Sequence, residues 1–244
     1  MRKAIGIIPA RYESSRFPGK ALAPILGKPM LQHVYERVQA ARKLERIIIA
    51  TDDERIYTAA QAFGAEVQMT SHTHISGTDR ISEVAAKLDT PIIINIQGDE
   101  PLIRGDMVDS LVLALQDETL PAATLAVKSD SPQEFQDEGT VKVVKDRNDN
   151  ALYFSRAPIP FSSGIKDSFW KHIGIYGYQK SFLLQIPRIP PSLLEESERL
   201  EQLRILEGGF RMKVIETRYS PRSVDFPEDI HTVENIIKKE DHGY

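Results

Sequence analysis

Two segments of the chain combine charged and small residues at spacings that suit a phosphorylated ligand and a metal ion. The first, Pro9–Lys20 (PARYESSRFPGK), carries three basic residues, Arg11, Arg16 and Lys20. Arginine grips phosphate oxygens with a planar fork and lysine adds a compact charge, so this loop could wrap a triphosphate. Small residues such as Ser14 and Gly19 would let backbone amides approach the phosphates. The alternative is a solvated loop with incidental charge, and the segment is not a Walker A motif.

The second segment is Asn95–Pro101 (NIQGDEP), which directly follows an apolar run. An aspartate that leaves a strand beside a glycine, as Asp99 does, can bind Mg²⁺, a cation that prefers carboxylate and phosphate oxygens. Asp225, in the sequence SVDFPED, is a candidate second ligand. Each aspartate also has an ordinary explanation, since Asp99 could form a turn and Asp225 could begin a helix.

Two further patterns carry weaker signals. Ser76–Arg80 (SGTDR) places Gly77 at the start of a helix, where free amides suit an anion or a base edge, but simple helix capping explains it equally well. His172 begins the strand-like HIGIYGY and shares one face with Tyr176, which is either a sugar-binding face or part of the core. His72 and His74 lack partners at ligand spacing and are assigned to a solvated loop.

The elements that must position these residues alternate between apolar runs and amphipathic segments. Strands are expected at Ala4–Ile8, Arg46–Ala50, Glu66–Met69, Pro91–Ile96 and Ala122–Val127. Helices are expected at Pro29–Lys43, from Glu54 onward, at Thr78–Leu88 and at Asp106–Gln116. This rhythm predicts an α/β fold with a mostly parallel sheet and helices on both faces. Ligands of such sheets bind beyond the carboxyl ends of the strands, and the loops after Ile8, Met69 and Ile96 hold the segments described above.

The rhythm changes from about residue 128. Val141–Lys145 and Ala151–Ser155 flank a turn-rich stretch and predict a hairpin. We therefore expect one domain, 1–244, with a core at about 1–127 and 193–244 and a small antiparallel insertion at about 128–192, used as a dimer interface. The second core segment is expected to hold a helix at Leu193–Glu207, a strand at Met212–Glu216 and a helix at Pro227–Lys238.

Composition excludes several classes of protein. The 244 residues have a formal net charge of −4, which argues against a nucleic-acid partner, and the absence of cysteine excludes disulfides and thiolate metal sites. The first apolar run is too short for a membrane span or a signal-peptide core, so we expect no membrane insertion and a cytoplasmic location.

In order along the chain, the motifs IIPARYxSSRFPGK, SGTDR, NIQGDEP, ALYFSRAPIP, HIGIYGY, LEQLR and VDFPED closely resemble those of the 3-deoxy-manno-octulosonate (Kdo) cytidylyltransferases. The resemblance covers essentially the whole chain. It implies a Rossmann-like nucleotide-binding core, a homodimer, Mg²⁺ as cofactor, CTP and Kdo as substrates, and a role in lipopolysaccharide synthesis. Where many relatives have threonine after the second aspartate, this chain has Phe226.

The resemblance also implies roles for particular residues. The nucleotide would be bound by Ala10, Arg11, Ser14, Arg16, Lys20, Gly77, Thr78 and Arg80. The metal would be bound by Asp99 and Asp225, which together with Arg11 and Lys20 form the catalytic set. The sugar would be bound by Gln97, Arg156, His172, Tyr176, Glu201 and Gln202.

The implied reaction is attack of the anomeric hydroxyl of the sugar on the α-phosphorus of CTP, with loss of pyrophosphate. Phosphoryl-type transfer relies mainly on alignment and charge neutralisation. The alternatives are activation of another acidic sugar, such as 8-amino-Kdo or sialic acid, a glycosyltransferase, and a non-catalytic nucleotide-binding regulator.

Overall fold

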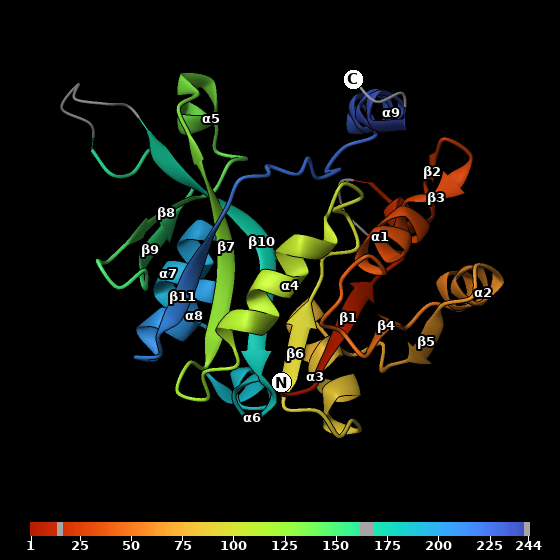
Figure 1. Cartoon of the computed structure of the whole chain (residues 1–244), viewed down its shortest axis with the longest axis horizontal. Helices are drawn as coiled ribbons and strands as arrows, with labels where there is room; N and C mark the ends of the chain where they lie inside the picture. Colours follow the sequence, from red (N-terminus) through yellow and green to blue (C-terminus); the bar gives the residue numbers. More distant parts are fainter. Residues whose placement is uncertain (14–16, 162–167, 242–244) are drawn as a thin grey trace.

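The computed structural model describes residues 1–13, 17–161 and 168–241, and one mixed sheet runs through its centre (Figure 1). Within these ranges the sheet has nine strands, and its main path is β11-β7-β10-β6-β1-β4-β5. The parallel part contains β1 (Ala4–Ala10), β4 (Arg46–Thr51), β5 (Glu66–Met69) and β6 (Ile92–Asn95). At the other edge β11 (Met212–Thr217) runs parallel to β7 (Ala122–Ser129). The predicted α/β class and the positions of these strands are confirmed.

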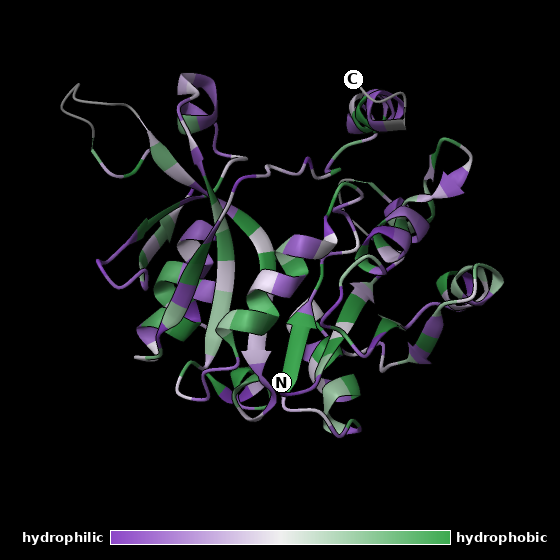
Figure 2. Cartoon of the chain, in the orientation of Figure 1, coloured by the Kyte–Doolittle hydropathy of each residue, from purple (hydrophilic) through white to green (hydrophobic). Residues whose placement is uncertain are grey.

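The sheet is covered on both faces because its strands are apolar on both sides. Ala4 and Ile8 of β1 pack in one buried cluster with α1 (Met30–Val38), α2 (Glu54–Ala62) and α4 (Gly105–Ala114). Ile5 and Ile7 pack in a second cluster with α3 (Gly77–Ala86) and α8 (Gln202–Glu207). Alternate residues of a strand face opposite sides, so a strand covered twice has an unbroken apolar sequence. Figure 2 shows β1 and β6 as strongly apolar ribbons in the middle of the sheet.

The strand expected at His172–Tyr178 is longer, and it lies inside the main sheet. This strand, β10 (Phe169–Gln179), lies between β6 and β7 and runs antiparallel to both. Its pairing with β7 is interrupted by a bulge between Ile173 and Tyr176. The sheet therefore passes through both the expected core and the expected insertion.

The predicted hairpin is confirmed. β8 (Lys142–Lys145) and β9 (Ala151–Ser155) pair in antiparallel fashion, and β8 also pairs with β10. The hairpin is thus a side branch that leaves the sheet from β10 (Figure 1).

The single helix predicted at Leu193–Glu207 is wrong. The chain forms α7 (Leu193–Glu198) and then α8, because Arg199 adopts a left-handed conformation with φ of 54° and ends the first helix. The turn buries Leu200, whose backbone N–H donates to Glu195 O at 3.3 Å. It also places Glu201 and Gln202 at the start of the second helix.

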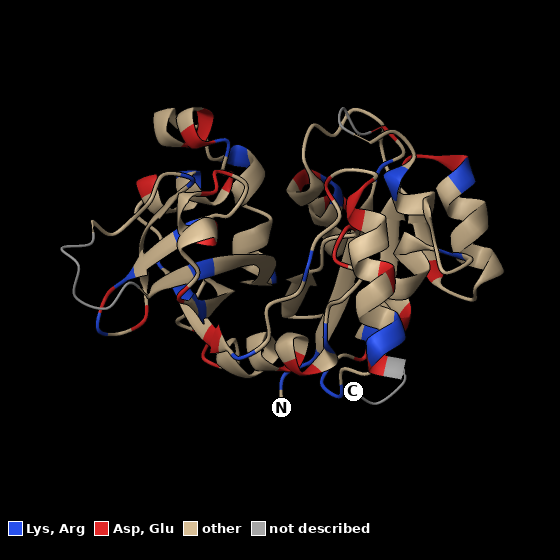
Figure 3. Cartoon of the chain, turned by 90° about the horizontal axis from the view of Figure 1, so that it is seen from above, with Lys and Arg blue, Asp and Glu red and all other residues tan. Residues whose placement is uncertain are grey.

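The remaining elements are short, apart from the last helix. They are η1 (Lys20–Leu22), β2 (Pro24–Ile25), β3 (Lys28–Pro29), α5 (Pro132–Gln136), α6 (Lys180–Leu183), η2 (Ile186–Arg188) and α9 (Asp229–Asp241). Among the described residues, no helix has the length and apolar character needed to cross a membrane. Acidic and basic residues are interspersed over the outer helices and loops rather than gathered by sign (Figure 3).

Candidate functional site: a cleft at the carboxyl ends of the strands

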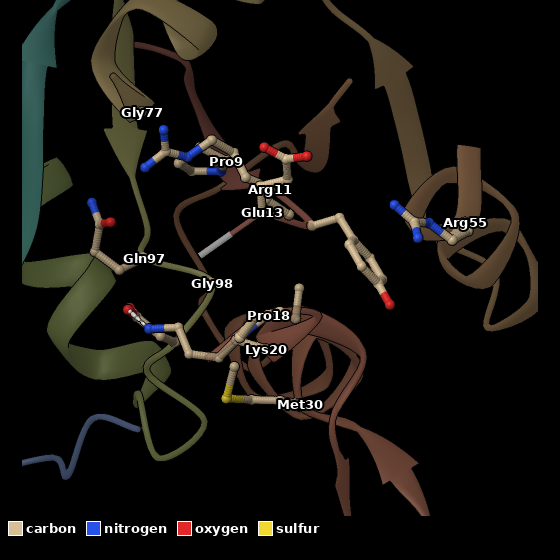
Figure 4. A pocket seen from close by; sticks show the side chains of 14 residues that line it. Pro9, Arg11, Glu13, Pro18, Lys20, Met30, Arg55, Gly77, Gln97 and Gly98 are labelled. Atoms are coloured by element: carbon tan, nitrogen blue, oxygen red, sulfur yellow. Dashed lines mark hydrogen bonds and ion pairs between the residues drawn. The ribbon is translucent and has the colours of Figure 1, made fainter. Parts of the chain in front are cut away.

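A cleft of about 980 Å³ opens where the loops after β1 and β6 meet the start of α3 (Figure 4). Loops converge there because the carboxyl ends of parallel strands lie at the same edge of a sheet. Six of the predicted site residues line this cleft, namely Ala10, Arg11, Lys20, Gly77, Gln97 and Asp99. Ser14 and Arg16, which were predicted to join them, lie outside the described residues.

Lys20 connects three distant parts of the chain at the edge of this cleft. Its Nζ donates to Asp99 Oδ2 at 2.6 Å and to the backbone oxygen of Val224 at 3.0 Å. The pair is partly shielded from water, since the side chain of Lys20 is 15% exposed and that of Asp99 is 32% exposed. Figure 4 shows Lys20 extending across the floor of the cleft toward the loop that contains Gly98.

A tight turn ahead of Lys20 depends on Gly19. Its φ of +73° is a conformation that other residues rarely adopt, and a Cβ there would lie 3.2 Å from the ring of Tyr12. The N–H of Gly19 donates to Tyr12 O at 2.8 Å, so the two ends of the basic loop are tied together. This closure directs Lys20 into the cleft.

Close backbone contacts bring the three loops together. A Cβ on Gly98 would lie 3.1 Å from the backbone oxygen of Pro9, and one on Gly77 would lie 3.4 Å from the Pro9 ring. Arg11 Nη1 donates to Ile75 O at 3.3 Å, which ties the loop after β1 to the segment before α3. Glycine allows this proximity because it has no side chain.

The two predicted metal ligands lie near each other. The N–H of Val224 donates to Asp99 O at 3.0 Å, which brings the neighbouring residue Asp225 to the end of β6. Both aspartates act electrostatically on Glu100. Burial raises the pKa of Glu100 to about 8, and the charges of Asp99 and Asp225 add to the increase. Glu100 Oε2 is also a buried oxygen without a hydrogen-bond partner.

This donor set fits a hard divalent cation. Mg²⁺ is usually bound by one or two carboxylates together with substrate phosphates rather than by an all-protein cage. In agreement with that, the described residues contain no group of three or more acidic, histidine or cysteine residues that could hold a metal ion alone. His74 is engaged elsewhere, with Nε2 2.8 Å from Glu83 Oε2.

Thr78 and Arg80, predicted to contact the nucleotide, have different surroundings. Arg80 is fully buried, with Nη2 2.8 Å from Asp52 Oδ2 and Nη1 donating to Thr70 Oγ1. Thr78 donates from its hydroxyl to Glu201, a residue predicted to bind the sugar. The start of α3 is therefore linked directly to the start of α8.

Apart from Gln97, the predicted sugar-binding residues lie at the end of β9, on β10 and at the start of α8. The rings of His172 and Tyr176 lie 5.5 Å apart, and the charge of Glu201 adds to the effect of burial in raising the pKa of Tyr176. Burial also raises the pKa of Glu201 itself, against hydrogen bonds with Thr78 and Ser76. Gln202 Nε2 is buried without a hydrogen-bond partner among the described residues.

Arg156 is held at the end of β9 by backbone oxygens. Its Nε donates to Glu198 O and its Nη1 donates to Glu138 O, both at 2.9 Å. The carboxylate of Glu198 accepts from Tyr153, Ser155 and the N–H of Arg156. No sequence pattern indicated Glu198, which ends α7 at the unpredicted break before α8.

Arg55 is a cleft residue that the sequence did not indicate. Its guanidinium carbon lies 3.3 Å from the centroid of the Tyr12 ring, and it forms an ion pair with Asp53. Both Arg55 and Tyr12 line the cleft, together with Glu13. Arg55 belongs to no motif, and it reaches the cleft because α2 lies close to the loop after β1.

Comparison with known proteins agrees with this geometry. Residues 5–216 match the family model described as cytidylyltransferase. The chain is 52% identical to the 3-deoxy-manno-octulosonate cytidylyltransferase of Solibacter usitatus, over 97% of this chain and 95% of that protein. It is 49% identical to the enzyme of the same name from Geobacter metallireducens, over 95% of this chain and 96% of that protein.

A solved structure is similar over nearly the whole chain. It is CMP:2-keto-3-deoxy-manno-octonic acid synthetase in complex with CTP, with a TM-score of 0.93, 43% identity, and coverage of 98% of this chain and 99% of that one. A cytidylyltransferase from Leptospira borgpetersenii, 19% identical with a TM-score of 0.65, shares the fold. The chain therefore belongs to the cytidylyltransferase family, among the 3-deoxy-manno-octulosonate cytidylyltransferases.

Proposed function

We propose that this chain transfers CMP from CTP to Kdo, forming CMP-Kdo and pyrophosphate for lipopolysaccharide synthesis. The observation that carries the proposal is the contact between Lys20 and Asp99 at the end of β6, in a cleft that also holds Arg11 and Gly77. A phosphate-binding cation and a metal-binding carboxylate thus meet at one point. The names of the full-length relatives, and the CTP bound to the similar solved structure, support the choice of substrates.

The nucleotide would lie between the loop after β1 and the start of α3. The triphosphate would be bound by Arg11 and Lys20, together with Ser14 and Arg16 of the same loop. The backbone of Ala10 and Gly77 would contact the nucleoside. Thr78 would support this side through its hydrogen bond with Glu201. Arg80 would act indirectly, because it is fully buried and fixes the ends of β4 and β5 through Asp52 and Thr70.

Asp99 and Asp225 would bind a divalent cation, which we propose to be Mg²⁺. When bound there, the ion would neutralise phosphate charge and lower the pKa of the attacking hydroxyl. Lys20 would then turn from Asp99 toward the phosphates. Both reactants are anions, so the cationic side chains of the loop are needed to bring them within reacting distance.

The sugar would lie against β10 and the start of α8, beside the nucleotide. Gln97 lines the same cleft as Asp99, donates to Asn95 Oδ1 at 3.3 Å, and would contact the sugar from the loop after β6. Arg156 would bind the sugar carboxylate, and His172, Tyr176, Glu201 and Gln202 would bind its hydroxyls. In the reaction the anomeric oxygen on C2 bonds to the α-phosphorus, and the bond from that phosphorus to the bridging oxygen breaks to release pyrophosphate.

We further propose that the enzyme acts in the cytoplasm as a homodimer of single-domain subunits. Three exposed apolar side chains of β9, of the segment that follows it and of α7 are candidates for cover by a second subunit. These are Leu152, 62% exposed, Phe161, 93% exposed, and Leu193, 79% exposed. Leu152 and Phe161 lie within the 128–192 segment and Leu193 directly follows it, which is the reason to assign dimerisation to that segment. Sedimentation of the wild type and of Leu152→Glu tests this, and a wild-type monomer at micromolar concentration would end it.

Pyrophosphate release tests the proposed activity directly. The purified chain would be supplied with CTP and Mg²⁺, and with Kdo, 8-amino-Kdo or sialic acid in parallel reactions. Release of pyrophosphate in the reaction with CTP and Kdo is the expected result. Faster turnover of 8-amino-Kdo or sialic acid would reassign the sugar, and CTP binding without pyrophosphate from any sugar would indicate a regulator.

A further inference from the structure

The bulge in β10 is stabilised by one buried hydroxyl. Thr124 of β7 is completely buried, and its Oγ1 lies 2.8 Å from Ile175 O and 3.3 Å from Ile173 O. These carbonyls flank the point where the pairing of β10 with β7 shifts register. The same oxygen lies 2.9 Å from His172 Nε2. Thr124 is therefore the contact between the irregular part of β10 and the imidazole ring of His172.

The hydrogen-bond inventory of Thr124 determines the tautomer of His172. A threonine hydroxyl has one hydrogen to donate and two lone pairs to accept with. Its shortest contact is with a carbonyl oxygen, Ile175 O, which can only accept, so the hydrogen is used there. The contact with His172 must then be donation from the ring to Thr124, which places the proton on Nε2 and leaves Nδ1 as an acceptor.

Nδ1 has no hydrogen-bond partner in the described part of the protein. The hydrogen-bond contact of the ring is the one between Nε2 and Thr124, and His172 as a whole keeps 9% of its surface exposed. An acceptor without a described partner thus lies among the predicted sugar-binding residues.

The surroundings of the ring keep it neutral and fixed. Phe154 meets it edge to face with ring centroids 4.9 Å apart, and the centroid of the Tyr176 ring lies 5.5 Å away. Burial lowers the pKa of His172 to about 3, so the ring carries a single proton throughout the neutral range. A neutral imidazole with one defined tautomer can distinguish a hydrogen-bond donor from an acceptor on its ligand.

We propose that Thr124 is a positioning residue for the sugar site, which holds His172 as the Nε2–H tautomer so that Nδ1 accepts a hydrogen bond from a sugar hydroxyl. The proposal rests on the proposed function for the identity of the ligand, but the tautomer is a property of the free protein. Thr124 itself touches no substrate. It acts through the ring and through the bulge that aims the ring.

The first test is nuclear magnetic resonance of the free enzyme labelled with ¹⁵N-histidine. The signals of His172 are identified by their loss in His172→Gln, and they should show a protonated Nε2 and a bare Nδ1 that do not change between pH 5 and 8. A ring with its proton on Nδ1, or one that titrates in this range, would overturn the proposal without any variant of Thr124.

The second test removes only the hydroxyl, with Thr124→Val. We expect a loss of the fixed tautomer and a rise of about five- to tenfold in the KM for Kdo, since one hydrogen bond is worth about 1 kcal/mol. The KM for CTP should stay within about twofold, because the tautomer concerns the sugar side alone. Thr124→Ser keeps the hydroxyl and should restore both the tautomer and the KM for Kdo.

The matched control is Thr90→Val, which removes another buried threonine hydroxyl that donates to backbone oxygens, Lys3 O at 3.1 Å and Ile92 O at 3.4 Å. It lies at the opposite end of β6 and should leave the KM for Kdo and the tautomer of His172 unchanged. If Thr124→Val alters the tautomer and leaves the KM for Kdo unchanged, the proposed link is refuted. A raised KM for Kdo with an unaltered tautomer would refute it as well. Failure of the wild type to use Kdo would instead refute the proposed function, while the tautomer would still be measured.

Discussion

Replacement of Lys20 by methionine is the sharpest test of the cleft. Methionine keeps most of the length and apolar bulk of lysine but removes the charge that contacts Asp99 at 2.6 Å and Val224 O at 3.0 Å. In the free enzyme the loss should be small, because Asp99 is 32% exposed and water can take the place of the ammonium group. We expect the free energy of unfolding to fall by at most about 1 kcal/mol.

The effect on catalysis should be much larger. A unit charge about 4 Å from a phosphate oxygen is worth roughly 4 kcal/mol at an effective dielectric constant of about 20. Part of this energy is recovered by water and by neighbouring cations such as Arg11. We therefore expect kcat/KM to fall by about 10²–10³-fold, the usual effect of removing one preorganised group that stabilises the transition state.

Initial rates of pyrophosphate release, measured with each substrate varied in turn, give the result. Lys28→Met is the matched control, because Lys28 pairs with Glu36 on the surface with side chains 48% and 40% exposed. It should change the rate by less than about twofold, since exposed pairs contribute little. A Lys20→Met enzyme within about threefold of the wild type would show that Lys20 has no role in the chemistry.

Four further predictions concern the metal, the sugar, packing and pH. Asp99→Asn should lower kcat by at least about 10²-fold while the circular dichroism spectrum is unchanged, and near-normal turnover would remove Asp99 from the metal site. Arg156→Ala should raise the KM for Kdo by about tenfold or more with little change in the KM for CTP, and an unchanged KM for Kdo would contradict its role. Gly105→Ala should lower the free energy of unfolding by at least about 2 kcal/mol in chemical denaturation, because the new Cβ would lie 2.5 Å from backbone atoms of Ala40 and Ala41, and full stability would show that these segments can separate. The folded pKa of His172, about 3, lies below its ordinary value of 6.5, so only the unfolded chain gains this proton as the pH falls between these values. The stability conferred by the neutral ring is therefore complete above about pH 6.5 and is lost below it. His172→Gln should reduce that loss in denaturation curves recorded from pH 7 to 4, and an equal loss in both proteins would contradict the buried neutral ring.

Local patterns were enough to predict the parallel half of the fold. The runs at β1, β4 and β6 are apolar without interruption, and each is followed by a segment with helical periodicity, so both the elements and their order were readable. The same reasoning placed Lys20 and Asp99 at the carboxyl edge of the sheet, because Lys20 belongs to the loop after β1 and Asp99 to the loop after β6. Six predicted residues do line one cleft for this reason.

The sequence could not predict the pairing of β10 or the break after α7. Pairing between β10 and β6 joins residues about 80 positions apart, and alternation within one strand does not identify its neighbour. The break depends on Arg199 in a left-handed conformation, which glycine and asparagine adopt far more readily than arginine. The turn buries Leu200, and no local propensity indicates a tertiary contact of this kind.

The position of β10 also has a consequence for redesign of the enzyme. Tyr176 lies opposite Asn95, four residues before Asp99, and this register is set by backbone hydrogen bonds in the middle of the sheet. The separation between the proposed sugar-binding strand and the proposed metal-binding carboxylate should therefore change little with side-chain substitutions. Efforts to accept a longer or branched acid should begin at Gln202, whose buried Nε2 has no hydrogen-bond partner among the described residues, rather than at Glu201, which is bonded to Thr78 at the start of α3.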